Sequence, residues 1–294
     1  MLLILILILL LLYILCNKSI LCIIIFFIVI QYLIINTNPY KNFDSDKMSI
    51  LNYISDKYKP KSEYFNINTN YKFPYILKPT VCSRTSKDVS LISNKQELKD
   101  YLKDYLKNNN NFNELMYQEF IDTDYEIGIS YERNPLNSDG KIISIVHRTF
   151  LGGKNFNPMD IKYYIGEKRK SYMVNRSDLI NNKLNKIIDT ISKSIPNFYV
   201  GRFDIRVKKL SDLDKGHFFI LEANGTMGFD LRKDINFYLN PYSIYIKIRF
   251  ILIRIFYGFL NIFKLNIVNP RIIVRSYYNA FKCKDWEKIF AVYT

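Results

Sequence analysis

Histidine and cysteine, the side chains that most often bind transition metals, are scarce in this 294-residue sequence. Only two histidines and four cysteines are present, and the cysteines form no Cys-x-x-Cys pair and no spacing typical of metal ligands. The pattern therefore argues against a disulfide framework and against a zinc site. A Cys/His catalytic pair is disfavoured for the same reason, so His147 and His217 are interpreted as ordinary surface or sheet residues.

Acidic residues are also in short supply, with 27 Asp and Glu against 42 Lys and Arg, which gives a formal net charge of +15. Such a surplus suits an anionic partner such as a nucleotide, a nucleic acid or an acidic lipid. The sequence is, however, rich in Ile, Asn, Lys and Tyr, whose codons are A/T-rich, so we attribute the surplus to codon bias more than to a dedicated basic surface. No nucleic-acid recognition motif accompanies it, and no nucleic-acid partner is expected.

The N-terminal segment is almost continuously apolar from residue 2 to residue 35, with Lys18 as its only charge. About 20 apolar residues span a bilayer as a helix, so one tilted span is favoured over a hairpin that turns at residues 17–19. The segment lacks the positive n-region of a cleaved signal peptide. Residues 1–35 are therefore predicted to be a single-pass transmembrane anchor. Lysines between residues 41 and 61 favour a cytosolic position for the rest of the chain.

Beyond the anchor, hydrophobic periodicity divides the chain into residues 44–240 and a basic, apolar tail at residues 241–294. Strands are predicted at residues 73–79, 115–120, 126–131, 142–150, 199–207 and 218–224, and helices at residues 44–59, from residue 93 into the asparagine run, and at residues 177–195. This mixture predicts an α+β fold with antiparallel sheets rather than a doubly wound parallel sheet. Residues 152–172 are polar and irregular, which is typical of a mobile loop. Residues 244–264 fit equally a helix on an anionic membrane surface and a buried terminal helix.

Two of the predicted strands carry the polar residues of greatest chemical interest. Side chains alternate along a strand, so Arg202 and Asp204 share one face of residues 199–207, and Glu222 and Asn224 share one face of residues 218–224. If the strands pair in a suitable register, two carboxylates and an amide oxygen converge beside Arg202. Ligands that are all oxygen suit Mg²⁺, with Mn²⁺ as the alternative ion. The competing interpretation is an ordinary hairpin with a solvated polar face.

These strands resemble the metal-binding hairpin of ATP-grasp enzymes, and in particular of the D-alanine:D-alanine ligase-like group. The resemblance is carried by Gly-Arg-Phe-Asp at residues 201–204 and by Phe-Ile-Leu-Glu-Ala-Asn at residues 219–224. Other motifs follow the order of that family over residues 44–230. Phe-Pro-Tyr-Ile-Leu-Lys-Pro at residues 73–79 is similar to the strand whose lysine holds the ATP phosphates, which implicates Lys78, and Ser-Asp-Lys at residues 45–47 is similar to a first phosphate contact, which implicates Lys47.

The resemblance also assigns the nucleoside end of the ligand. Tyr-Gln-Glu-Phe-Ile at residues 117–121 resembles the hinge whose backbone meets adenine. The residues implicated there are Gln118, Glu119, Phe120 and Ile121, and Glu126 falls where the family places a ribose-binding glutamate. Two α+β lobes are then expected to hold ATP between them, preceded by the transmembrane helix.

The activity implied by the resemblance is that of an ADP-forming carboxylate-amine ligase. ATP would phosphorylate a carboxylate to an acyl phosphate, from which an amine displaces phosphate; the resemblance identifies neither substrate. Asp204, Glu222 and Asn224 are the expected ligands of Mg²⁺, which bridges the phosphates in such reactions. Arg202 is the candidate catalytic residue, because a guanidinium beside the metal can stabilise a transferring phosphoryl group or an acyl phosphate oxyanion.

Two departures from the family motivate an alternative. Residues 80–89 contain no glycine, whereas the family usually has glycines there that let backbone N–H groups approach phosphate. The separate substrate domain that precedes the lobes in the D-alanine ligases is also missing, and the predicted anchor occupies that position. The alternative is therefore a catalytically weak or inactive ATP-binding module at a membrane.

Overall fold

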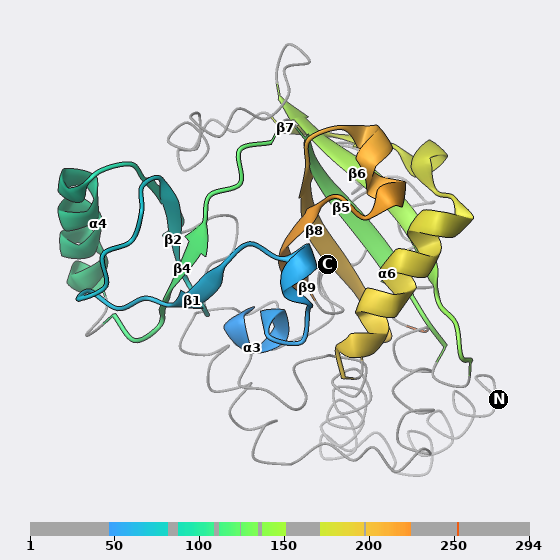
Figure 1. Cartoon of the computed structure of the whole chain (residues 1–294), viewed down its shortest axis with the longest axis horizontal. Coiled ribbons are helices and arrows are strands. Elements are labelled where there is room, and N and C mark those ends of the chain that lie inside the picture. The colour runs from blue at the N-terminus through green and yellow to red at the C-terminus, as the bar shows by residue number, and fades with distance from the viewer. Residues whose placement is uncertain are drawn as a thin grey trace, which may run out of the picture.

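The computed structural model describes residues 47–81, 88–108, 112–123, 125–134, 137–150, 171–196 and 198–224, together with residue 252. These residues form two lobes, each built on its own antiparallel sheet (Figure 1). The predicted anchor, all four cysteines, most of residues 152–172 and the tail apart from residue 252 lie outside this description. None of the described helices is long and apolar enough to cross a membrane.

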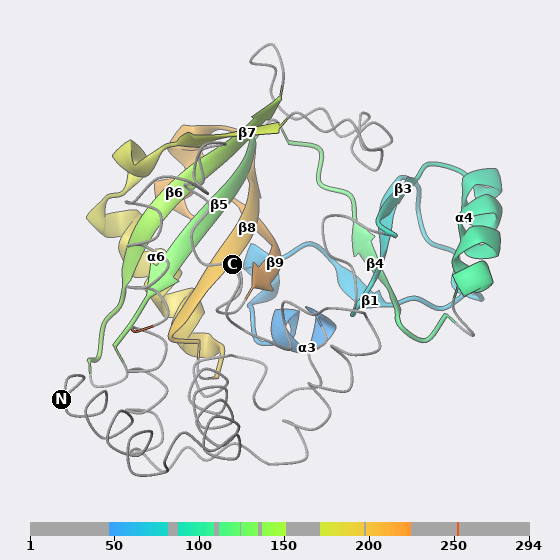
Figure 2. The same cartoon turned by 180° about the vertical axis from the view of Figure 1, so that it is seen from behind.

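The smaller lobe has four strands in the order β1-β4-β2-β3, all paired antiparallel. The strands are β1 (Ser62–Tyr64), β2 (Tyr75–Pro79), β3 (Ser90–Ile92) and β4 (Leu115–Glu119). Helix α4 (Lys95–Asn108) lies on the side away from the larger lobe in Figures 1 and 2. Leu77, Tyr117 and Leu102 are part of the apolar core that joins this helix to the sheet. One face of β2 and β4 therefore packs against α4, and the other face is directed toward the larger lobe.

Helix α4, which the sequence predicts to start near residue 93, begins with two capping hydrogen bonds between side chains and backbone. The side chain of Asn94 accepts a hydrogen bond from the backbone N–H of Glu97 at 2.9 Å, and the Glu97 carboxylate accepts from the N–H of Ser93, also at 2.9 Å. These contacts satisfy backbone donors that no helical carbonyl reaches.

The larger lobe has five strands in the order β7-β6-β5-β8-β9, again all antiparallel. They are β5 (Tyr125–Glu132), β6 (Lys141–Phe150), β7 (Ser171–Asn175), β8 (Val200–Val207) and β9 (Phe219–Asn224). Helix α6 (Asn182–Ser194) covers one face of this sheet (Figures 1 and 2) and inserts Leu184, Ile188 and Ile191 into the core. The short helix α3 (Lys47–Leu51) also packs into this core, so the first described element belongs with the larger lobe.

The predicted α+β fold with antiparallel sheets is confirmed, and His147 lies in β6 while His217 is exposed. The helix predicted at residues 44–59 is wrong as a single element. The structure has α3 followed by a 3-10 turn at Asp56–Tyr58, because the chain bends after Leu51 to bury Ile54 in the core. The helix predicted at residues 177–195 is likewise split into a 3-10 turn at Ser177–Leu179 and α6, which starts after the capping residue Asn181. The loop predicted up to residue 172 ends earlier, since β7 starts at Ser171.

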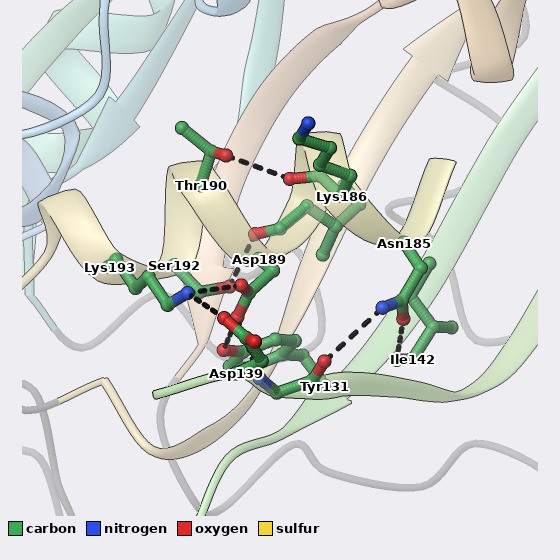
Figure 3. Close-up of polar contacts among 11 residues, drawn as sticks. Tyr131, Asp139, Ile142, Asn185, Lys186, Asp189, Thr190, Ser192 and Lys193 are labelled. Carbon is green, nitrogen blue, oxygen red and sulfur yellow. Dashed lines mark hydrogen bonds and ion pairs between the residues drawn. The ribbon is translucent and has the colours of Figure 1, made fainter. Parts of the chain in front are cut away.

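A buried carboxylate fastens α6 to the sheet beneath it (Figure 3). Asp189 accepts hydrogen bonds from the hydroxyl of Tyr131 at 2.5 Å and from the backbone N–H of Gly140 at 2.9 Å. Its second oxygen pairs with Lys193, which also reaches the exposed Asp139 at 2.8 Å. Burial and the contact with Asp189 raise the pKa of Tyr131 far above its usual value, so the hydroxyl remains a donor.

Replacing Asp189 with asparagine is expected to lower the free energy of unfolding by about 1–2 kcal/mol, because a buried charge-assisted contact is lost while the side-chain shape is kept. Chemical denaturation measures the change. Asp139→Asn is the matched control. Asp139 also pairs with Lys193, but its side chain is 79% exposed, so its replacement should change the free energy of unfolding little. Equal losses in both variants would contradict the role given to the buried contact.

Candidate functional site

The hairpin of β8 and β9 has the register that the candidate metal site requires. Asp204 lies directly opposite Glu222, and Arg202 lies opposite Asn224. On the other side of β8, Phe203 and Ile205 are fully buried, so the four polar residues share the face that α6 does not cover. A bulge follows Asp204 and leaves these two pairs undisturbed.

The connection between the two strands explains why they return in this register. It contains a 3-10 helix at Leu210–Lys215, anchored in the core by Leu213 and ended by Gly216. Gly216 has a φ of 72°, in the left-handed region where glycine is favoured, and its N–H contacts the carbonyls of Asp212 and Leu213. Gly201 contributes at the far end, because a Cβ there would stand 2.5 Å from the Asn224 carbonyl oxygen. A glycine is therefore needed where β9 ends against β8.

Asp204 is held by two neighbours on the hairpin. Arg202 donates to both carboxylate oxygens, with Nε to Oδ1 at 2.7 Å and Nη2 to Oδ2 at 2.8 Å, and the Asn224 side-chain amide donates to Oδ2 at 2.9 Å. Bidentate pairs of this kind are among the stronger polar contacts in proteins. Burial disfavours the charged form of Arg202, but Asp204, with smaller contributions from Glu222 and Glu126, outweighs burial and raises the pKa of Arg202. The guanidinium thus stays positive beside the candidate metal ligands.

Glu222 forms an ion pair with a lysine from the start of the described chain. Lys47, the first residue of α3, places its Nζ 3.1 Å from Glu222 Oε1, and its backbone N–H donates to the Thr80 carbonyl at 3.1 Å. Burial favours the neutral form of Glu222, yet the charges of Lys47, Lys78 and Arg202 together lower its pKa. The carboxylate is therefore ionised near neutral pH.

Lys78 approaches the hairpin from the smaller lobe. Its Nζ donates to the side-chain oxygen of Gln118 at 3.0 Å and to the backbone carbonyl of Leu221 at 3.4 Å, although only 6% of the residue is exposed. Burial, with the nearby charge of Lys47, lowers the pKa of Lys78 to about 8, and Glu222 and Asp204 act in the opposite direction. A buried ammonium has lost most of its hydrating water, so it gains strongly from contact with an anion.

The predicted hinge lies where the chain leaves one sheet for the other. Strand β4 of the smaller lobe ends at Glu119 and β5 of the larger lobe starts at Tyr125, so Phe120 and Ile121 lie in the connection. The Glu119 side chain accepts from the N–H of Lys61 at 3.2 Å, and the Ile121 carbonyl accepts from Arg206 at 3.0 Å. Gln118 is buried beside Lys78 rather than in the connection itself.

Glu126 lies between two arginines that sequence reasoning did not assign. It is opposite Arg148 on β6 and opposite Arg206 on β8. The contacts are 2.8 Å from Arg148 Nη1 to Oε1 and 3.7 Å from Arg206 Nη2 to Oε2. Arg206 lies two residues after Asp204 on β8 and so shares its face by strand alternation, but nothing in the sequence pairs Arg148 with Glu126. The residue proposed to bind ribose therefore comes with a counter-ion on each neighbouring strand.

Five charged residues among the predicted site residues come together at the boundary of the lobes. They are Lys47, Lys78, Arg202, Asp204 and Glu222, which form three positive and two negative groups. This balance suits a polyanion accompanied by a cation.

The donor set of the hairpin fits a hard divalent cation. Asp204, Glu222 and Asn224 offer only oxygen among their acceptors, and magnesium commonly takes few protein oxygens and completes its shell with phosphate and water. A bound cation must share Asp204 with Arg202, which contacts both oxygens of that carboxylate. Within the residues that the structure covers, no group of three or more His, Cys, Asp or Glu side chains is arranged to hold a metal. The asparagine is therefore essential to a three-ligand site here.

No protein-family model and no curated protein sequence matches the chain. Among solved structures, it is similar to the VanG D-Ala:D-Ser ligase of Enterococcus faecalis, with 16% identity, a TM-score of 0.42 and coverage of 65% of this chain and 55% of that one. It is also similar to the D-alanine:D-alanine ligase of Bacillus anthracis, with 17% identity, a TM-score of 0.45 and coverage of 76% and 69%. An L-amino acid ligase of Bacillus licheniformis matches with 14% identity, a TM-score of 0.40 and coverage of 64% and 40%. The chain thus spans little more than half of the VanG ligase.

Proposed function

We propose that this protein binds ATP with magnesium between its two lobes and uses it to activate a carboxylate for attack by an amine. The observation that carries the proposal is the convergence of Lys47, Lys78 and Arg202 with Asp204 and Glu222. Three separate parts of the chain, namely α3, β2 and the β8–β9 hairpin, contribute to this cluster. The reaction type comes from the order of the sequence motifs, which resembles that of the ATP-grasp ligases.

The lysines, the hairpin residues and the hinge have separate roles in this proposal. Lys47 and Lys78 supply positive charge for the phosphates, as a lysine does in other phosphate sites. Asp204, Glu222 and Asn224 hold the magnesium ion, which when bound neutralises charge that develops during phosphoryl transfer. Arg202 lies beside these ligands and stabilises the transferring phosphoryl group or the oxyanion that forms when the amine attacks. The hinge backbone at Phe120 and Ile121 receives adenine, and Glu126 receives the ribose.

The apolar run at residues 2–35 supports a membrane tether, and the lysines after it support a cytosolic position, where ATP is available.

The absence of glycine from residues 80–89 supports a second candidate, a nucleotide-binding module that turns over ATP slowly or not at all. Release of ADP in the presence of a panel of amino acids and peptides separates the two candidates. ADP release that depends on added carboxylate and amine supports the ligase, whereas ATP binding without release supports the module.

Removal of magnesium tests the shared part of the proposal. For the 294-residue chain in detergent, calorimetry is expected to show ATP binding that weakens strongly when magnesium is chelated, because the carboxylates of Asp204 and Glu222 then face the phosphates without a cation between them. Equal affinity with and without magnesium, or no affinity for ATP, would contradict the proposal.

Extraction of membranes with alkaline carbonate tests the tether separately. The chain is expected to stay with the membranes, and its release in that buffer would contradict a transmembrane anchor.

A further inference from the structure

Gln118 occupies an unusual place for a residue next to a hinge. It is the penultimate residue of β4 and is only 2% exposed. Its neighbour Tyr117 points into the aromatic core of the smaller lobe, whereas Met116, on the same face of the strand as Gln118, belongs to the core of the larger lobe. Gln118 therefore extends a polar side chain from one lobe toward the other.

The amide of Gln118 contacts three elements at once. Its oxygen accepts from Lys78 on β2 at 3.0 Å, and its nitrogen donates to the Leu221 carbonyl on β9 at 3.2 Å and to the hydroxyl of Ser62 on β1 at 3.1 Å. A lysine only donates and a carbonyl only accepts, so these partners fix the orientation of the amide. Its oxygen must face Lys78, and its nitrogen must face Leu221.

The same contacts determine the position of the Lys78 ammonium. Two of its three N–H donors have acceptors, namely the Gln118 oxygen and, at 3.4 Å, the Leu221 carbonyl. Leu221 directly precedes Glu222, so the smaller lobe is joined to the backbone of the strand that carries a candidate metal ligand. Among the residues that the structure describes, one donor of the ammonium remains for an incoming phosphate oxygen.

We propose that Gln118 is a positioning residue, which joins β4 to the Leu221 carbonyl and holds Lys78 ready for the nucleotide phosphates before the ligand arrives. The proposal rests on the proposed function, since it assumes that Lys78 contacts phosphate. Preorganisation of this kind improves affinity because the ordering of the lysine does not have to accompany binding. Gln118 acts on affinity through Lys78, and its contact with the Leu221 carbonyl fixes the orientation of the amide that holds the lysine.

Replacement of Gln118 with methionine keeps the size of the side chain and removes its hydrogen bonds. Affinity for ATP with magnesium, measured by calorimetry on the full-length chain, is expected to fall about tenfold, the equivalent of one good hydrogen bond. Ser62→Ala is the matched control, because it removes the outer partner of the amide and the hydroxyl's own contact with the Pro60 carbonyl, and leaves the contacts of Gln118 with Lys78 and Leu221 in place. It should change affinity by less than about twofold. Gln118→Glu is the second variant if the methionine variant does not fold. It should also bind ATP more weakly, since its carboxylate competes with phosphate for Lys78.

A double-mutant cycle separates positioning from a general loss of structure. In a Lys78→Met background, Gln118→Met should cause no further loss of affinity, because the group on which it acts has been removed. The proposal would be overturned if Gln118→Met reduced affinity as much in the Lys78→Met background as in the wild type. It would also be overturned if Gln118→Met alone bound ATP like the wild type while Lys78→Met bound it weakly. Equal ATP binding by the wild type and Lys78→Met would instead contradict the phosphate role of Lys78, and with it this part of the proposed function.

Discussion

Replacing Glu222 with glutamine is expected to weaken ATP binding in the presence of magnesium by at least about 100-fold. Substitution of groups that merely support metal ligands costs about 10–100-fold, and Glu222 is a candidate ligand itself. Its carboxylate is ionised and lies opposite Asp204, so its loss leaves a single charged ligand on the hairpin. Calorimetric titration with ATP at saturating magnesium measures the effect.

Magnesium-free titrations make this prediction more specific. Without the ion, Glu222→Gln should bind ATP at least as well as the wild type, because the variant lacks a negative charge near the phosphates and Lys47 loses its carboxylate partner. Asp104→Asn is the control, since Asp104 lies on α4 with a 73% exposed side chain and pairs only with Lys107 among the contacts observed. Loss of affinity to the same extent with and without magnesium would indicate a folding defect and contradict the metal role.

The candidate metal site was predictable because it depends on local rules. Strand alternation assigned Arg202 and Asp204 to one face, and Glu222 and Asn224 to one face of the next strand. Only their mutual register remained open, and the structure determines it through the connection that ends at Gly216. The motif order then placed Lys47 and Lys78 near the hairpin, and the contact between Lys47 and Glu222 agrees with that placement.

The residues that sequence reasoning missed depend on pairing between distant strands. Arg148 reaches Glu126 because β6 pairs with β5 in one particular register, which no local pattern of side chains reveals. Gln118 was assigned through its backbone, and its side chain acquires a role only because β2 lies beside β4 and β9 lies across the lobe boundary. The Leu221 carbonyl gives no signal in a sequence, since every residue carries one.

The short elements were missed for a different reason. Strand β1 has three residues, too few to show an alternating pattern, and it exists because β4 offers it a partner. The helix predicted at residues 44–59 was divided because core contacts of Met48 and Ile54 outweigh local helix preference. Tertiary contacts therefore decided the secondary structure wherever the local signal was short or mixed.

Affinity for ATP with magnesium is expected to fall as the pH rises above about 8, by up to about tenfold per pH unit, with the steepest change governed by Lys78. Burial and the charge of Lys47 lower the pKa of Lys78 to about 8 in the absence of nucleotide, despite the opposing effects of Glu222 and Asp204. Bound phosphate stabilises the protonated form, so the pKa rises on binding. The complex therefore takes up a proton in the range between the two pKa values, and raising the pH there opposes binding.

Well below pH 8 this contribution to affinity levels off, because Lys78, with a pKa of about 8, is then almost fully protonated in the unliganded protein. Dissociation constants measured from pH 7 to about pH 9.5 test the profile, with Lys186→Met, which removes an exposed lysine of α6, as the control. In Lys78→Met the alkaline decline should disappear and the affinity at pH 7 should be lower, since the variant lacks the charge at every pH. An alkaline decline that persists unchanged in Lys78→Met would assign the titration to another group, and a level profile in the wild type would mean that the Lys78 ammonium does not meet the phosphates.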